Sequence, residues 1–282
     1  MKKLFLLTLM TLCSVFAFSQ SRTICCSQST SATQKFAMLA SDKKFIQAHP
    51  NPKKYHFQST IGKAITYKTT GGPDANAFEF KAKTPTNNWL IVIHEFWGLN
   101  DFVKHESEKL YNDLGNINIL DLDLYDGKVA ATREEAGKYM QALPDARARA
   151  IINGAIAYVG PNARIATIGW CMGGGWSLQA SLMAGKQDVA CVMYYGMPEQ
   201  DVAKLKTLNA DVLGNFASQD QWINPKVVAA FAENMKAAGK KLDYKEYDAA
   251  HGFSNPSNPI YNSAATTDAY ARTVAFLKPR LK

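Results

Sequence analysis

The sequence is poor in cysteine, and its cysteines form no recognisable redox or zinc motif. There are five in 282 residues. Cys25 and Cys26 are adjacent, and the others are isolated. The absence of a Cys-x-x-Cys motif argues against thiol-disulfide exchange, and the spacing fits neither a disulfide scaffold nor a zinc site. Cys191 lies inside an apolar run, so we expect it to be a small core residue.

Long apolar segments are also lacking, apart from the N-terminus. Two lysines at positions 2 and 3 precede the apolar residues 4–12, and small residues follow at Ala17 and Ser19. This run is too short for a membrane span, and its pattern is that of a secretory signal. We predict a signal peptide over residues 1–19 and an exported protein, periplasmic or secreted. We expect no membrane association after cleavage.

No block of like charge occurs, although the chain is basic overall. The formal net charge is +8, and the lysines and arginines are scattered along the chain. Scattered positive charge does not indicate nucleic-acid binding. The composition, 47% hydrophobic and 20% charged, is that of an ordinary globular protein able to bury a substantial core.

Residues 20–54 read as a partly disordered leader with a short helix expected over 34–48, and one domain follows over 55–282. An antiparallel opening pair of strands is expected first. Strands then alternate with helices, which predicts an α/β fold with a mainly parallel central sheet and helices on both faces. The predicted strands are residues 64–69, 77–81, 89–93, 117–122, 165–168, 189–195, 210–217 and 242–247. The predicted helices are residues 101–114, 133–143, 145–159, 177–184, 202–208, 225–238 and 264–277.

One cysteine lies in the pattern of a nucleophile elbow. An apolar strand over 165–168 ends at Gly169, and Cys171 follows between Trp170 and Met172, with further glycines from Gly173 onward. In Gly-x-Cys-x-Gly the turn between strand and helix is so tight that neighbouring side chains must be absent. The alternative is a buried structural cysteine beside a glycine-rich turn.

Polar residues follow the ends of other predicted strands. Glu95 follows the strand over 89–93, Asp220 follows that over 210–217, and His251 follows that over 242–247. Ligands of an open parallel sheet bind beyond the carboxyl ends of its strands. The order Cys171, Asp220, His251 is the chain order of α/β-hydrolase triads. We therefore predict a Cys-His-Asp triad.

From about residue 57 to residue 281 the chain resembles the dienelactone hydrolase family of α/β-hydrolases. The resemblance depends on motifs in the family's order: His94-Glu95-Phe96-Trp97-Gly98, Asp121-Leu122-Asp123-Leu124-Tyr125, the elbow around Cys171, Asp220, and His251-Gly252-Phe253. It implies that Cys171 is the nucleophile, His251 the base and Asp220 the residue that orients the histidine. It also implies that Glu95 is a carboxylate beside the resting thiol.

The same loops suggest the oxyanion hole and the substrate wall. The backbone N–H groups of Met172 and Phe96 are the expected oxyanion donors. Trp97, Tyr125 and Trp222 are the expected substrate contacts, since aromatic walls suit a small apolar or aromatic ester or lactone. We expect a monomer that needs no metal and no organic cofactor.

One position departs from the family pattern. Dienelactone hydrolases proper carry an arginine for the substrate carboxylate shortly after the His-Gly-Phe motif, where this chain has Ser254 and Asn255. The natural substrate therefore stays open. A general carboxylesterase or thioesterase is one alternative, and a non-catalytic exported binding protein on a hydrolase fold is another.

Overall fold

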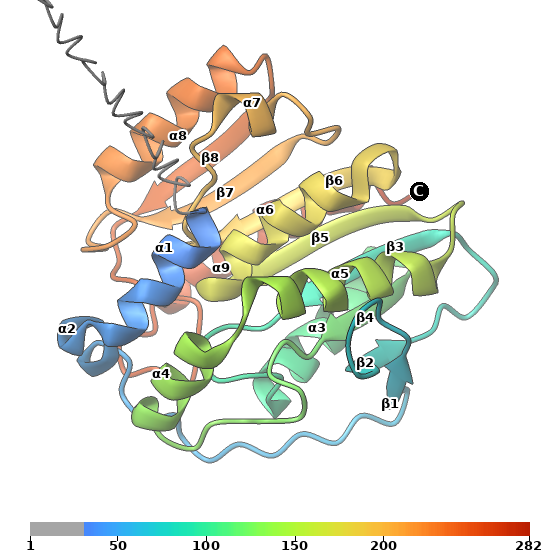
Figure 1. Cartoon of the computed structure of the whole chain (residues 1–282), viewed down its shortest axis with the longest axis horizontal. Coiled ribbons are helices and arrows are strands. Elements are labelled where there is room, and N and C mark those ends of the chain that lie inside the picture. Colours follow the sequence, from blue (N-terminus) through green and yellow to red (C-terminus); the bar gives the residue numbers. More distant parts are fainter. Residues whose placement is uncertain (1–30) are drawn as a thin grey trace, which may run out of the picture.

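A computed structural model describes residues 31–282, and the predicted signal peptide lies outside the described residues. Eight strands form one sheet in the order β1-β2-β4-β3-β5-β6-β7-β8 (Figure 1). Within the described part of the chain, no helix is both long and apolar enough to cross a membrane. The strands are β1 (Gly62–Tyr67), β2 (Ala75–Phe80), β3 (Asn88–Ile93), β4 (Asn118–Leu122), β5 (Arg164–Trp170), β6 (Asp188–Tyr194), β7 (Val212–Ala217) and β8 (Leu242–Tyr247).

The sheet is antiparallel at its beginning and parallel afterwards. β1 pairs antiparallel with β2, and β2 pairs antiparallel with β4. Every other neighbouring pair is parallel. Strands buried on both faces read as continuous apolar runs, and Leu90 to Ile93 of β3 are wholly buried. The fold is the α/β-hydrolase fold predicted from the sequence.

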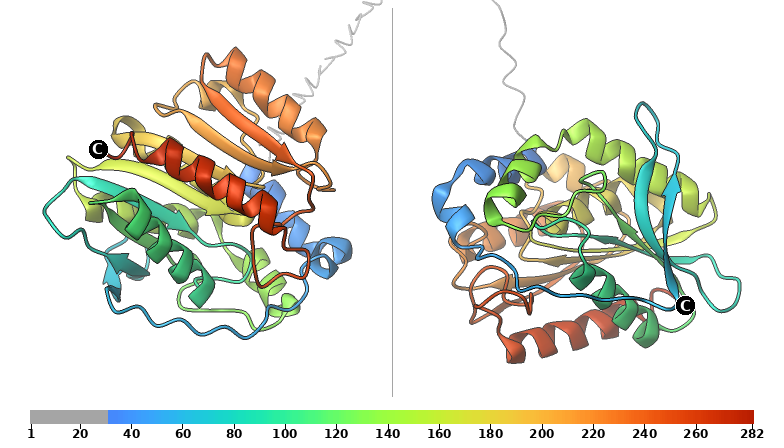
Figure 2. Two further views of the ribbon diagram at one scale, coloured as in Figure 1. Left: turned by 180° about the vertical axis from the view of Figure 1, so that it is seen from behind. Right: turned by 90° about the horizontal axis from the view of Figure 1, so that it is seen from below.

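Helices cover both faces of the sheet (Figure 2). α3 (Asp101–Leu114) and α9 (Ser263–Leu277) lie together on one face. The other face carries α5 (Asp145–Val159), α6 (Met172–Ala184) and α8 (Pro225–Ala237). Two shorter helices are α4 (Arg133–Ala142) and α7 (Val202–Leu205), and a 3-10 turn, η2, covers Gly185–Gln187.

One helix begins earlier than the sequence suggested. We expected a helix from residue 177, because glycine has poor helix propensity, but α6 starts at Met172 directly after the elbow. Its three glycines lie against backbone: a Cβ on Gly173 would meet the carbonyl oxygen of Ile93 at 2.3 Å, and one on Gly174 would meet that of Tyr194 at 2.7 Å. Close packing of this turn therefore overrides propensity.

The N-terminal segment precedes the sheet in the sequence but packs against it in the fold. We call residues 31–52 the cover; it contains α1 (Ala32–Met38), η1 (Leu39–Ser41) and α2 (Lys43–Gln47), as expected of a short helical stretch. Phe36 and Phe45 are buried in the main core. This packing buries apolar surface of the cover against α6, α4 and the loops that carry Phe96 and Trp222. The division of the chain at residue 55 stays a prediction.

Candidate active site

Cys171 occupies a strained turn between β5 and α6. Its backbone has φ +55° and ψ −120°, a region that residues with a side chain rarely adopt. A Cβ on Gly169 would meet the carbonyl oxygen of Gly173 at 2.1 Å. Glycine is therefore required at position 169, as the elbow pattern predicts.

A chain of hydrogen bonds joins the three residues predicted as the triad. Nε2 of His251 lies 3.2 Å from Sγ of Cys171, and Nδ1 of His251 donates to Oδ2 of Asp220 at 2.6 Å. The other oxygen of Asp220 accepts hydrogen bonds from the backbone N–H groups of Trp222, at 2.8 Å, and Ile223, at 3.0 Å. Asp220 is thus held on both oxygens, and it fixes the tautomer of His251 with a proton on Nδ1.

Burial and charge set the protonation of these groups. Burial raises the pKa of the Cys171 thiol, and the charge of Glu95 adds to the rise. Burial would lower the pKa of His251, but the Asp220 carboxylate and Cys171 outweigh it and raise that pKa well above its ordinary value. The pKa of Asp220 is lowered, because the His251 charge and hydrogen bonds exceed the opposing effect of burial. Burial and Glu95 thus favour the thiol form of Cys171, while the Asp220 carboxylate makes His251 a stronger base toward the thiol proton.

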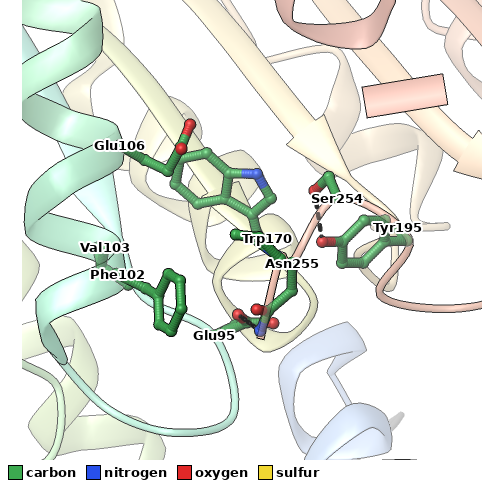
Figure 3. A pocket seen from close by; sticks show the side chains of 9 residues that line it. Glu95, Phe102, Val103, Glu106, Trp170, Tyr195, Ser254 and Asn255 are labelled. Atoms are coloured by element: carbon green, nitrogen blue, oxygen red, sulfur yellow. Dashed lines mark hydrogen bonds between the residues drawn. The ribbon is translucent and has the colours of Figure 1, made fainter. Parts of the chain in front are cut away.

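Glu95 is directed at Asn255. Among residues 31–282 no hydrogen bond joins Glu95 to Cys171; Oε1 of Glu95 instead accepts one from Nδ2 of Asn255. The amide orientation is fixed, since Oδ1 of Asn255 accepts from the backbone N–H of Ser257 at 2.8 Å. Burial raises the pKa of Glu95 to about 7. Figure 3 shows the two side chains meeting.

Glu95 and Asn255 belong to the wall of a small cavity. Its other lining includes apolar side chains, among them Phe102, Val103 and Trp170, and one further carboxylate, Glu106 (Figure 3). Both charged side chains of the lining are therefore acidic. Like charges repel, so this lining disfavours an anionic ligand.

Tyr125 contacts both residues whose backbone N–H groups are the predicted oxyanion donors, and that role of the N–H groups stays a prediction. The backbone of Met172 hydrogen bonds to Cys171 and opposes the rise in its pKa. The Tyr125 hydroxyl lies 3.4 Å from the carbonyl oxygen of Phe96 and 3.4 Å from Sδ of Met172. Tyr125 is itself buried. It contacts both donor residues, whereas its expected contact with substrate stays a prediction.

The two tryptophans predicted to contact substrate do not line the cavity beside Glu95. Trp97 is buried against Phe96, with ring centroids 5.1 Å apart. Trp222 lies over His251, with centroids 6.1 Å apart, and its indole N–H donates to Asp42 of the cover at 3.3 Å. Trp222 therefore joins the cover to the acid-bearing loop, and substrate contact by either ring stays a prediction.

Two further residues touch the site and were not anticipated from the sequence. His49, at the end of the cover, is buried, with Nε2 4.0 Å from Sγ of Cys171. Burial lowers its pKa to about 3, and the charge of His251 adds to the effect, so its imidazole is neutral. Tyr195, after β6, stacks edge-on against His251 at 5.1 Å. A single histidine or tyrosine outside a motif carries no sequence signal of this kind.

Potential metal ligands gather at one place in the described part of the chain. His49, Cys171 and His251 form the single group there of three or more such side chains whose ligand atoms lie within 4.8 Å of one another. All three are buried. Cys191, by contrast, is a fully buried core residue of β6, as expected.

Comparison with known proteins shows the family of the chain. The model of the dienelactone hydrolase family matches residues 76–281. The chain belongs to the dienelactone hydrolase family. It is 28% identical over 240 residues to a putative carboxymethylenebutenolidase of Saccharolobus solfataricus, covering 69% of this chain and 91% of that protein. Carboxymethylenebutenolidase 1 of Cupriavidus pinatubonensis is 24% identical over 234 residues, covering 77% and 97%.

Solved structures show the same fold. A putative dienelactone hydrolase from Klebsiella pneumoniae superposes with a TM-score of 0.65 at 20% identity, covering 76% of this chain and 98% of that chain. The dienelactone hydrolase-like promiscuous phosphotriesterase P91 superposes with a TM-score of 0.67 at 19% identity, covering 79% and 100%. The family match begins at residue 76, so the cover and His49 precede it.

Proposed function

We propose that this dienelactone hydrolase-like protein is an exported enzyme that uses Cys171 as a nucleophile to cleave a small uncharged ester or lactone. One observation carries the proposal: the thiol at the strained elbow is hydrogen bonded to His251, which is hydrogen bonded to Asp220. A nucleophile, a base and an orienting acid in contact form the recurring unit of acyl transfer. Export is inferred from the signal-like sequence of residues 1–19.

The first half of the reaction forms a thioester. His251 takes the thiol proton as Sγ of Cys171 attacks the substrate carbonyl, and the carbonyl electron pair moves to oxygen. The backbone N–H groups of Met172 and Phe96 stabilise that oxyanion, each donor contributing about 3 kcal/mol. The oxyanion collapses, the carbon–oxygen bond of the ester breaks, and His251 returns its proton to the leaving alkoxide. In a lactone this alcohol stays attached to the acyl group.

The second half releases the product by hydrolysis. His251 removes a proton from water as the water oxygen attacks the thioester carbonyl. The tetrahedral intermediate expels the Cys171 thiolate, which takes the proton from His251, and the carboxylic acid product departs. Asp220 stabilises the imidazolium in both halves because its pKa is lowered and it stays ionised.

The cavity beside Glu95 supports an uncharged substrate. Glu95 and Glu106 are its charged side chains, and Asn255, where the resemblance led us to expect an arginine, is used to hold Glu95. A substrate carboxylate would find no cation among these lining residues. The apolar part of the wall, including Phe102 and Trp170, instead suits an apolar acyl or aryl group.

Steady-state hydrolysis of a matched substrate panel tests the proposal. The panel pairs neutral aryl esters and lactones with analogues that carry a carboxylate, and it includes thioesters of the same acyl group. We expect turnover of the neutral oxygen esters or lactones, loss of turnover in Cys171→Ala, and weak activity on the anionic analogues. Faster turnover of thioesters alone would favour a thioesterase. No turnover by wild type would favour a binding protein.

A further inference from the structure

His49 brings a third metal-binding atom to the proposed nucleophile and base. Its Nε2 lies 4.0 Å from Sγ of Cys171, and Nε2 of His251 lies 3.2 Å from the same sulfur. All three ligand atoms lie within 4.8 Å of one another in a buried setting. The proposed hydrolysis uses Cys171 and His251 but gives no task to His49.

The two imidazoles are oriented as metal ligands are. Nδ1 of His49 donates a hydrogen bond to the backbone carbonyl of Phe45 at 2.7 Å, and Nδ1 of His251 donates to Oδ2 of Asp220 at 2.6 Å. Both rings therefore direct the Nε2 lone pair toward Cys171. Metal-binding histidines almost always donate their other ring N–H to a backbone carbonyl or a carboxylate, which fixes the ring and raises its basicity.

The chemistry of the three ligand side chains indicates which class of metal ion would bind. One thiolate and two imidazoles suit zinc and related first-row ions, whereas magnesium and calcium prefer oxygen. Tetrahedral zinc with ordinary bond lengths holds its ligands about 3.4 Å apart for two nitrogens and about 3.6 Å apart for sulfur and nitrogen. The present separations of 3.2 Å and 4.0 Å from the sulfur lie on either side of that value. The two histidine nitrogens lie within 4.8 Å of each other, so binding an ion would draw them together by up to about 1.4 Å.

We propose that His49, Cys171 and His251 form a site for Zn²⁺, and that Zn²⁺ bound there inhibits the enzyme reversibly. The ion replaces the thiol proton of Cys171, which is released to solvent, and binds Nε2 of both histidines, leaving a fourth position for water. Nucleophile and base are then both held by the metal. The binding site stands on geometry alone, while its inhibitory effect rests on the proposed function.

Metal binding would also fasten the cover. His49 belongs to the cover, whereas Cys171 and His251 belong to the part of the chain that the family model matches. An ion bound to all three joins the two parts, so Zn²⁺ raises the unfolding temperature of the wild type. In His49→Gln the ion has two protein ligands left and no hold on the cover, and the rise is lost.

Cobalt(II) titration followed by zinc displacement tests the site. The mature chain from residue 20 is used without a polyhistidine tag, with Cys25 and Cys26 changed to serine and a phosphine as reductant, so that these thiols do not bind the metal. We expect one equivalent of Co²⁺ with thiolate-to-cobalt charge-transfer absorption in the near ultraviolet. Zn²⁺ should abolish the absorption, and Cys171→Ser should lack it.

Variants at His49 separate ligation from folding. His49→Gln should weaken binding by more than about tenfold, while His49→Cys, which restores a ligand, should keep tight binding. His56→Gln, an exposed histidine near Asp101, is the matched control and should bind as wild type does. Equal affinity in wild type and His49→Gln, or charge-transfer absorption that persists in Cys171→Ser, would overturn the proposal. Neither result would affect acylation of Cys171 in metal-free buffer, which tests the proposed function separately.

Discussion

Asn255 donates a hydrogen bond to Glu95, although 160 residues separate the two in the chain. The amide can face no other way, because its oxygen is already bound by the backbone and the hydroxyl of Ser257. This contact lowers the pKa of Glu95, while burial, the larger effect, raises it to about 7. Glu95 therefore changes charge near neutrality, inside the same site as the thiol.

Glu95→Gln should change how readily Cys171 forms a thiolate. Above about pH 7 wild-type Glu95 is charged and raises the pKa of Cys171, whereas glutamine carries no charge. Alkylation of Cys171 by iodoacetamide should then be faster in the variant than in wild type above that pH, and the two rates should be equal below it. Ester turnover should be lower in the variant. Glu106→Gln, from the same cavity, is the control. Superimposable pH profiles with unchanged turnover would make Glu95 a bystander.

The raised pKa of Glu95 also predicts a pH-dependent stability. Between its ordinary value of 4.5 and its folded value of about 7, the folded chain binds more protons at this group than the unfolded chain. Stability from Glu95 is therefore present below pH 4.5 and lost as pH rises through 7. The free energy of unfolding of wild type minus that of Glu95→Gln should fall by about 3 kcal/mol across this window. Urea unfolding at several pH values measures it, and a flat difference would contradict burial of this carboxyl.

Cys171 and His251 should act as one unit. Cys171→Ala and His251→Ala should each lower kcat by several orders of magnitude, and the double variant should be little slower than either. Cys171→Ser should fold normally but hydrolyse far more slowly, because the hydroxyl needs a stronger base than the thiol. Additive losses in kcat, or near wild-type rates in Cys171→Ser, would argue against the thiol-imidazole pair.

The cover should control access to the thiol. Cys171 is fully buried, and the ring of Phe45 packs within 6.0 Å of His251 and 5.1 Å of Trp222, measured between centroids. Phe45→Ala removes a buried aromatic ring at a cost of about 3 kcal/mol or more. Local opening, and with it alkylation of Cys171, should rise about 100-fold. Met38→Ala, at an exposed position of the same segment, should leave the rate unchanged; equal rates in Phe45→Ala and wild type would contradict this role.

The sequence predicted the fold, and the meeting of the three side chains of the proposed triad, for a physical reason. Parallel strands carry their functional residues at their carboxyl ends, so Cys171, Asp220 and His251 could each be placed from the strand that precedes it. The elbow glycines, too, are a local requirement of the turn. Such features depend on residues close together in the chain.

The rest of the site depends on contacts between distant segments. His49 reaches Cys171 across 122 residues. Nothing in the Ser- and Thr-rich leader indicates that its helices pack over the sheet edge. The pairing of Asn255 with Glu95 is likewise a property of tertiary packing. The sequence showed that position 255 lacks the arginine expected from the family, but it did not show that Asn255 contacts Glu95.

The most direct test of the account is detection of the acyl-enzyme. The protein is mixed with an activated aryl ester, quenched with acid within the first turnovers, and digested for mass spectrometry. We predict one acyl group on the peptide that contains Cys171, and none in Cys171→Ala. The acylated peptide should accumulate at the same rate as the initial burst of released phenol. Ser177 on α6 carries a rival hydroxyl, which already donates a hydrogen bond to the carbonyl oxygen of Val192 at 2.9 Å. Acylation of Ser177, or hydrolysis without any acylated residue, would contradict the proposed mechanism.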